Sequence, residues 1–187
     1  MKYLVTGLGN IGDKYANTRH NIGFEILDAF AEASNFSFQD KRYGFIGDTK
    51  YKGRSIYCLK PSTYVNLSGN AINYWLKKLK IPLENLFVLV DDIALPFGKI
   101  RIRAQGGDGG HNGLIHIIQV LGTQEFARLR FGIGNEFYSG QQVNYVLGEW
   151  TEEEKNALLK KIKIVIEIIQ SFTFIGLERT MNQYNNK

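Results

Sequence analysis

The sequence has a single cysteine, few prolines and no long apolar run. The lone Cys58 excludes an internal disulfide, a zinc site built from several cysteines and an iron–sulfur cluster. No stretch approaches the roughly 18 consecutive apolar residues of a membrane span, and the first residues, MKYLVTG, lack the apolar segment of a signal peptide. We therefore expect a soluble, cytoplasmic protein with no membrane association.

Length and composition favour one globular domain. The chain has 187 residues, 44% of them hydrophobic, which is enough to bury a substantial core. Its net charge of +5 favours anionic partners only weakly, because charge spread over a whole surface serves solubility. No repeat, linker or low-complexity tract interrupts the sequence, so we expect a single domain over residues 1–187.

Strand and helix patterns alternate along the chain. Strands are predicted at 2–6, 42–48, 54–59, 86–90, 99–103 and 128–134, and helices at 22–35, 66–80, 114–121, 151–170 and 174–182. The entirely apolar run 86–90 suits a strand covered on both faces. Thr151 and Glu154 form a capping box that begins a helix. This order predicts an α/β fold with a mixed sheet.

The motif GLGNIG after the first strand has the spacing of a dinucleotide-binding fingerprint. However, residues 13–19 are polar and lack helical periodicity, and the acidic residue expected about 20 positions later is missing. A plain glycine turn is therefore the favoured interpretation. An NAD-dependent oxidoreductase remains the alternative.

A histidine and an aspartate stand where a general base would be built. His20 lies in a polar loop before the first helix, and Asp91 ends the strand 86–90, at the edge where open α/β sheets bind ligands. A carboxylate that accepts from one imidazole nitrogen leaves the other as a base near neutral pH. The alternative is two separate solvated side chains, because 71 positions divide them.

Motifs for other chemistries are absent. The sequence has no GxSxG elbow, HExxH or CxxC, and Cys58 lies within a predicted strand, so neither a covalent nucleophile nor a metal centre has an obvious candidate. His111 and His116 are five positions apart, which is poor spacing for two ligands on one helical face. If His20 acts as a base, it would therefore activate a water molecule.

The glycine-rich segment 106–113, GGDGGHNG, precedes a predicted helix. Its glycines permit close approach of another molecule, and the free N–H groups of the helix would bind an anion or a carbonyl oxygen. The alternative is a flexible turn with Asn112 as the helix cap. Asn21 likewise has a structural interpretation as the cap of the first helix.

Two predicted strands carry arginines in alternation. Arg101 and Arg103 share one face of their strand, and Arg128 and Arg130 share one face of another. If the two strands are neighbours, the four side chains form a basic face suited to phosphate. A solvated sheet face is the alternative.

Six segments in this order resemble the bacterial-type peptidyl-tRNA hydrolase family: GLGNIG, TRHNIGF, NLSGNA, VDDIALPFG, GGDGGHNGL and RLRFGIG. The similarity runs from residue 3 to about 148. It implies a single α/β domain with a twisted mixed β-sheet surrounded by helices. It also implies a monomeric hydrolase that cleaves the ester between a peptide and the 3′ ribose of tRNA and so returns tRNA to translation. No cofactor, metal or protein partner is implied.

The resemblance also assigns roles to residues. His20 would be the general base, and Asp91 would orient it. Arg103 and Arg130 would clamp a tRNA phosphate. The remaining matches are substrate-binding positions that line the cleft or lie near it and the acceptor-stem entrance: Asn10, Tyr15, Asn21, Val65, Asn66, Gly110, His111 and Asn112.

The chain departs from the family pattern at four positions. Ile11 replaces a common proline, Val65 a frequent methionine, Val90 a histidine or tyrosine, and Ala94 an aspartate. None of these changes removes a proposed catalytic group. A module that binds RNA without cleaving peptidyl-tRNA remains a further alternative.

Overall fold

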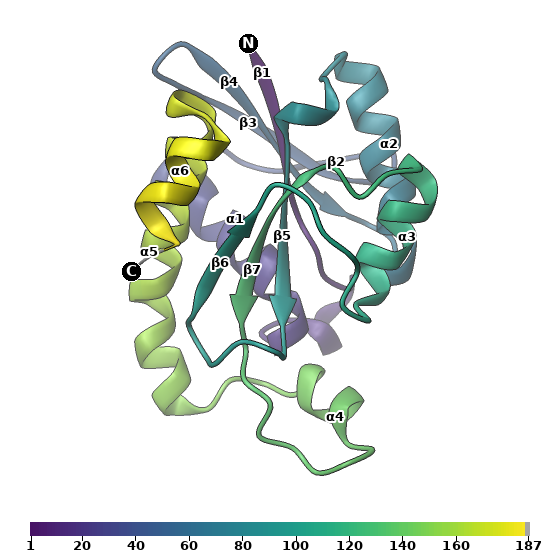
Figure 1. Ribbon diagram of the computed structural model, residues 1–187. Helices are drawn as coiled ribbons and strands as arrows, with labels where there is room; N and C mark the ends of the chain where they lie inside the picture. The colour runs from purple at the N-terminus through teal and green to yellow at the C-terminus, as the bar shows by residue number, and fades with distance from the viewer. Residues whose placement is uncertain (186–187) are drawn as a thin grey trace.

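The computed structural model describes residues 1–185, which form a seven-stranded mixed sheet with helices on both faces (Figure 1). The strands are β1 (Lys2–Gly7), β2 (Gln39–Lys41), β3 (Gly44–Tyr51), β4 (Arg54–Pro61), β5 (Leu86–Asp92), β6 (Ile100–Arg103) and β7 (Ala127–Gly132). Their order is β2-β3-β4-β1-β5-β7-β6. Strands β4, β1, β5 and β7 pair in parallel, whereas the β2–β3, β3–β4 and β6–β7 pairs are antiparallel. The expected α/β fold with a mixed sheet is confirmed.

Helices cover the sheet in two layers. The helices are α1 (Ile22–Ala33), α2 (Ser68–Leu79), α3 (Asn112–Leu121), α4 (Gln142–Val146), α5 (Glu152–Ile175) and α6 (Leu177–Tyr184). Figure 1 shows α2 and α3 on one side of the sheet, α5 and α6 on the other, and α4 below the strand ends. None of the helices in residues 1–185 has both the length and the apolar character that a bilayer crossing requires.

The central strand β5 shows why the apolar patterns were informative. Leu86, Val88 and Val90 point into the core with α2 and α3, whereas Phe87 and Leu89 point into the core with α1 and α5. A strand that is buried on both faces needs apolar residues at every position, which confirms the interpretation of residues 86–90.

Element boundaries differ from the predictions where backbone conformation decides them. The long helix continues to Ile175 and breaks at Gly176, which has a φ of 88°. Short β2 and the five-residue α4 were not predicted, because neither has buried residues that would give an apolar pattern. The capping box is confirmed: the Thr151 hydroxyl accepts from the Glu154 N–H, and the Glu154 carboxylate accepts from the Thr151 N–H.

Two glycines bring the loop after β1 to the carboxyl edge of the sheet. A Cβ on Gly7 would lie 2.2 Å from the carbonyl oxygen of Gly23, and one on Gly23 would lie 2.5 Å from the backbone nitrogen of Leu8. The start of α1 therefore packs directly on the end of β1. The 3₁₀ turn Arg19–Asn21 (η2), which carries His20, immediately precedes α1.

The GLGNIG segment ends β1 and continues as a short irregular loop, not as the start of a helix. After β1 the chain forms only a short 3₁₀ turn, Asp13–Tyr15 (η1), and α1 begins at Ile22. No helix starts at the glycines to meet a pyrophosphate, so the geometry of a dinucleotide fingerprint is missing from this part of the described chain.

Candidate active site

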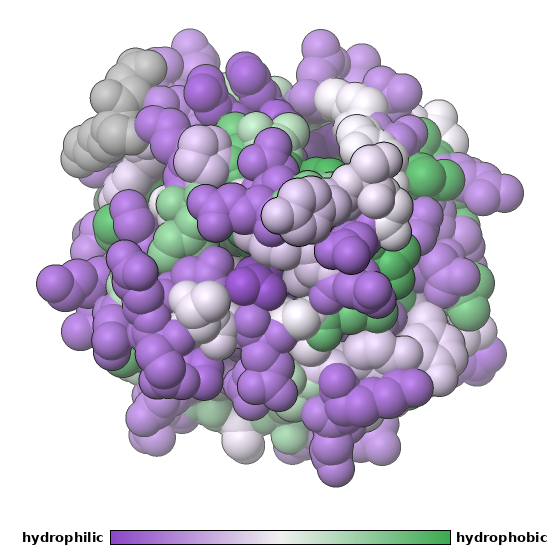
Figure 2. Space-filling model, turned by 90° about the horizontal axis from the view of Figure 1, so that it is seen from below, coloured by the Kyte–Doolittle hydropathy of each residue, from purple (hydrophilic) through white to green (hydrophobic). Residues whose placement is uncertain are grey.

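A cavity of about 540 Å³ opens at the carboxyl ends of β5 and β7. It contains nine of the predicted site residues: Asn10, His20, Val65, Asp91, Arg103, Gly110, His111, Asn112 and Arg130. Its wall also includes residues that were not predicted, notably Asp92 and, from α4 and the residue after it, Gln142, Val143, Val146 and Leu147. Figure 2 views the molecule from this end, where hydrophilic residues cover most of the surface and apolar patches lie between them.

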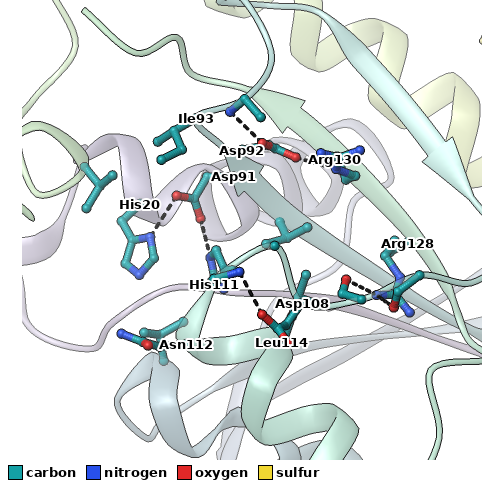
Figure 3. Close-up of a pocket in the computed structure, with 18 of the residues that line it drawn as sticks. His20, Asp91, Asp92, Ile93, Asp108, His111, Asn112, Leu114, Arg128 and Arg130 are labelled. Carbon is teal, nitrogen blue, oxygen red and sulfur yellow. Dashed lines mark hydrogen bonds and ion pairs between the residues drawn. The ribbon is translucent and has the colours of Figure 1, made fainter. Parts of the chain in front are cut away.

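Asp91 joins two histidines in the cavity (Figure 3). Its Oδ2 lies 2.8 Å from Nδ1 of His20, and its Oδ1 lies 2.8 Å from Nε2 of His111. The predicted contact between His20 and Asp91 is thus present. The second imidazole was not expected there, although His111 was placed near the cleft, because nothing in the local sequence shows that the loop 106–111 folds back onto the end of β5.

The hydrogen bonds determine which nitrogens carry protons. Nδ1 of His111 accepts the N–H of Gly113 at 3.1 Å, so the proton of the neutral ring is on Nε2, which donates to Asp91. The Asp91 carboxylate also accepts from Nδ1–H of His20. Nε2 of His20 therefore keeps its lone pair, on the side of the ring away from Asp91.

Electrostatics within the triad of His20, Asp91 and His111 favour charge on Asp91 and a basic His20. Burial lowers the pKa of His20, but the charge of Asp91 and its hydrogen bond outweigh this effect, so the pKa is raised above 6.5. Burial raises the pKa of Asp91, but His111 and His20 together lower this pKa by more than burial raises it. The net result is a pKa well below the usual range of an aspartate. Asp91 is therefore ionised at neutral pH, and it stabilises a proton on His20.

The triad has the donor set of a metal centre, with ligand atoms within 4.8 Å of one another. A metal on Nε2 of His111 would require a proton on Nδ1, because metal-bound imidazole normally donates its other ring N–H. That position already accepts the Gly113 N–H. The residues present therefore suit a hydrogen-bonded network better than a metal site.

Asn10 is held by a neighbouring asparagine. The Asn21 side chain accepts from the Asn10 N–H and donates to the Asn10 carbonyl oxygen, each at 2.9 Å. The Asn10 Oδ1 accepts from the Val65 N–H at 2.8 Å, which leaves its Nδ2 as a donor. Asn21 occupies the N-cap position of α1, as suggested, but its side chain makes these bonds and no cap bond.

The cap of α3 is also not the residue suggested from the sequence. The side chain of His111 caps the helix through Gly113, and Asn112 is the first residue of the helix. Asn112 is exposed and its side chain is therefore available at the cavity.

The two arginine-bearing strands are neighbours, as the basic face requires. Arg101 pairs with Arg130 and Arg103 with Arg128 across β6 and β7. Arg128, however, is 1% exposed and does not contribute to a solvent-facing surface. Its guanidinium donates to the carbonyl oxygens of Gly106, Gly107, Gln124 and Phe126 and thereby anchors the base of the glycine-rich segment. Arg130 forms an ion pair with Asp92, and Arg103 is exposed.

Three predicted substrate-binding residues do not line the cavity. Asn21 instead forms hydrogen bonds with the main chain of Asn10, and Asn66 is exposed in the 3₁₀ turn Val65–Leu67 (η3). Tyr15 packs its ring against Tyr64 with a centroid separation of 6.4 Å.

Comparison with known proteins identifies the family of this chain. The sequence model of the family described as peptidyl-tRNA hydrolase matches residues 4–187. A peptidyl-tRNA hydrolase of Phocaeicola vulgatus is 57% identical over 187 residues, with both chains fully covered, and one of Chlorobaculum tepidum is 44% identical over 98% of each chain. The crystal structure of peptidyl-tRNA hydrolase from Acinetobacter baumannii superposes with a TM-score of 0.91 at 31% identity, covering 98% of this chain and 94% of that one. The chain belongs to the peptidyl-tRNA hydrolase family.

Proposed function

We propose that this protein hydrolyses the ester bond between a peptide and the 3′ ribose of tRNA, using water activated by His20. The observation that carries the proposal is the arrangement of the triad. Asp91 accepts Nδ1–H of His20, so Nε2 is free to accept a proton from a water molecule in the cavity.

The reaction follows from this arrangement. Water transfers a proton to Nε2 of His20 while its oxygen attacks the carbonyl carbon of the ester. The amides of Asn10 and Asn112 donate to the resulting oxyanion, a role supported by the free Nδ2 of Asn10. The intermediate collapses as the bond to the 3′ oxygen breaks. The His20 imidazolium returns the proton to that oxygen, and the products are a peptide carboxylic acid and a tRNA 3′ hydroxyl.

The tRNA would bind beside the cavity through Arg103 and Arg130. Arg103 is exposed, and Arg130 is held in place by its ion pair with Asp92. A bound phosphate would replace the Asp92 carboxylate as a hydrogen-bond acceptor for the Arg130 guanidinium. A peptide longer than one residue would be favoured, because the asparagine amides need a second peptide unit to pair with. We also propose that the protein acts as a cytoplasmic monomer without a protein partner or cofactor.

A single histidine substitution tests the catalytic assignment. His20→Asn should lower kcat for a peptidyl-tRNA substrate by roughly 10²- to 10⁴-fold, the usual contribution of a general base, without weakening tRNA binding. His116→Asn is the matched control, because His116 lies outside the cavity lining and its one hydrogen bond, to the Gly69 N–H, has an asparagine equivalent. A His20 variant with near-normal turnover would refute the assignment. A wild-type protein that binds tRNA but releases no peptide would favour the RNA-binding alternative.

A further inference from the structure

The residue before His20 is a buried arginine. Arg19 is 8% exposed, and charged side chains are seldom buried unless they are paired. Its Nη2 donates to the Glu154 carboxylate at 2.9 Å, and its Nη1 donates to the Tyr145 carbonyl oxygen at 3.3 Å. The guanidinium carbon also lies 4.4 Å from the centre of the Tyr145 ring. We call Arg19, Tyr145 and Glu154 the Arg19 latch.

Backbone contacts reinforce the latch. The Arg19 N–H donates to the carbonyl oxygen of Gly148 at 3.0 Å, and Thr18 forms an isolated antiparallel bridge with Glu149. The turn η2, which presents His20, is therefore tied to residues 145–154 by both main chain and side chains. These residues are more than 120 positions away in the sequence.

The other side of the latch is the α4 wall of the cavity, formed by Gln142, Val143, Val146 and Leu147. Helix α4 has five residues, none of them fully buried, so few contacts fix its position: Tyr145 and Val146, both partly buried, pack against the core. A helix of this length is also unstable by itself. Tyr145 is its anchor: the ring packs against Arg19, and the hydroxyl donates to the Ile133 carbonyl oxygen at 2.6 Å.

We propose that Arg19 is a positioning residue that holds the α4 wall at a fixed distance from His20 and so determines affinity for the part of the substrate next to the ester. This inference rests on the proposed function. A wall that contacts the substrate equally in the ground state and the transition state contributes uniform binding. Loosening the wall therefore raises KM more than it lowers kcat.

Two substitutions break the latch in different ways. Arg19→Met keeps most of the buried stem but removes the charge and the donors. Glu154→Gln removes the charge that pairs with the buried guanidinium; because Arg19 and Thr151 donate to the same carboxylate oxygen, the amide oxygen can still accept both N–H groups, including the Thr151 N–H that caps α5. Each variant should raise KM for peptidyl-tRNA by about tenfold, and the double variant should be no worse than the more severe single variant.

Thr151→Ala is the matched control, because it removes a hydroxyl that accepts the Glu154 N–H but leaves the contact between Arg19 and Glu154 intact. It should lower the melting temperature while leaving KM within about twofold of wild type. If Thr151→Ala raises KM as much as Glu154→Gln, or if the two latch substitutions are additive, Arg19 has only a structural role and the proposal is wrong.

Amide hydrogen exchange provides a readout that does not depend on catalysis. Residues 142–147 should exchange faster in Glu154→Gln than in wild type or Thr151→Ala, and equal exchange in all three would overturn the proposal. This measurement also decides the matter if Arg19→Met fails to fold. A wild-type protein that does not cleave peptidyl-tRNA would contradict the proposed function but would leave the exchange result interpretable.

Discussion

The substitution Asp91→Asn should trap His20 in the wrong tautomer. His111 must donate from Nε2, because its Nδ1 accepts the Gly113 N–H. The new amide would therefore turn its oxygen toward His111 and its NH₂ group toward Nδ1 of His20. That nitrogen would then have to accept, and the His20 proton would move to Nε2, the nitrogen proposed to act as the base.

The hydrogen bonds set the size of the effect. Restoring the active tautomer requires the amide to flip, which leaves buried donors facing one another at a cost of about 1–3 kcal/mol. The active arrangement is then about five- to 150-fold less populated. The negative charge that stabilises imidazolium is also lost, so we expect kcat to fall on the order of 10³-fold, within the range for loss of a general base.

A second substitution should partly restore activity. Because the carbonyl oxygen of a glutamine can accept from the flipped amide, Asp91→Asn combined with His111→Gln should turn over faster than Asp91→Asn alone. The assay is release of free tRNA from peptidyl-tRNA under saturating substrate, with His111→Gln alone as the control. An Asp91→Asn enzyme within about tenfold of wild type, or a double variant slower than Asp91→Asn, would refute the tautomer reasoning.

Further predictions concern the pH dependence of the reaction, two arginines and a buried carboxyl group. Because the pKa of His20 is raised above 6.5, kcat/KM should rise with pH to a plateau, with the midpoint of the rise above pH 6.5; a rate that falls as the pH rises toward this plateau would contradict a His20 base. Arg103→Ala should leave stability unchanged but reduce the salt dependence of tRNA binding by about one unit of slope, whereas Arg128→Met should lower the free energy of unfolding by about 3 kcal/mol in urea titrations. An unchanged salt slope for Arg103→Ala would contradict a phosphate contact at Arg103, and unchanged stability of Arg128→Met would contradict the structural role of Arg128. Burial raises the pKa of Glu25 to about 7 against a hydrogen bond from Trp150. Between about pH 4.5 and 7 the folded state holds a proton that the unfolded state releases, so stability falls as pH rises. Thermal melts at pH 5 and pH 8 measure this loss of stability, and the loss should be smaller in Glu25→Gln than in wild type. An equal loss in the two proteins would contradict the raised pKa of Glu25.

Local patterns succeeded where burial is nearly symmetric or a motif is self-contained. The apolar run of β5 was identified because both faces of that strand are buried, and the capping box of α5 because each of its two side chains bonds to the main chain of the other, three positions away. They failed where the partner is remote. Alternation placed Arg128 on the correct face of β7 but could not show that the carbonyl oxygens of residues 106 and 107 would enclose its guanidinium.

The fold class, the lack of a helix at GLGNIG and the set of chemical groups available for catalysis could be predicted from local patterns, because periodicity, glycine and residue type act over a few neighbouring positions. How those groups meet depends on contacts between remote parts of the chain. The close packing of Gly7 on Gly23 brings His20 to the end of β5, and the folded-back loop 106–111 adds His111 to Asp91. These contacts also determine which nitrogens of His20 and His111 carry protons, because each proton position depends on the donor or acceptor that a distant chain segment places beside the ring.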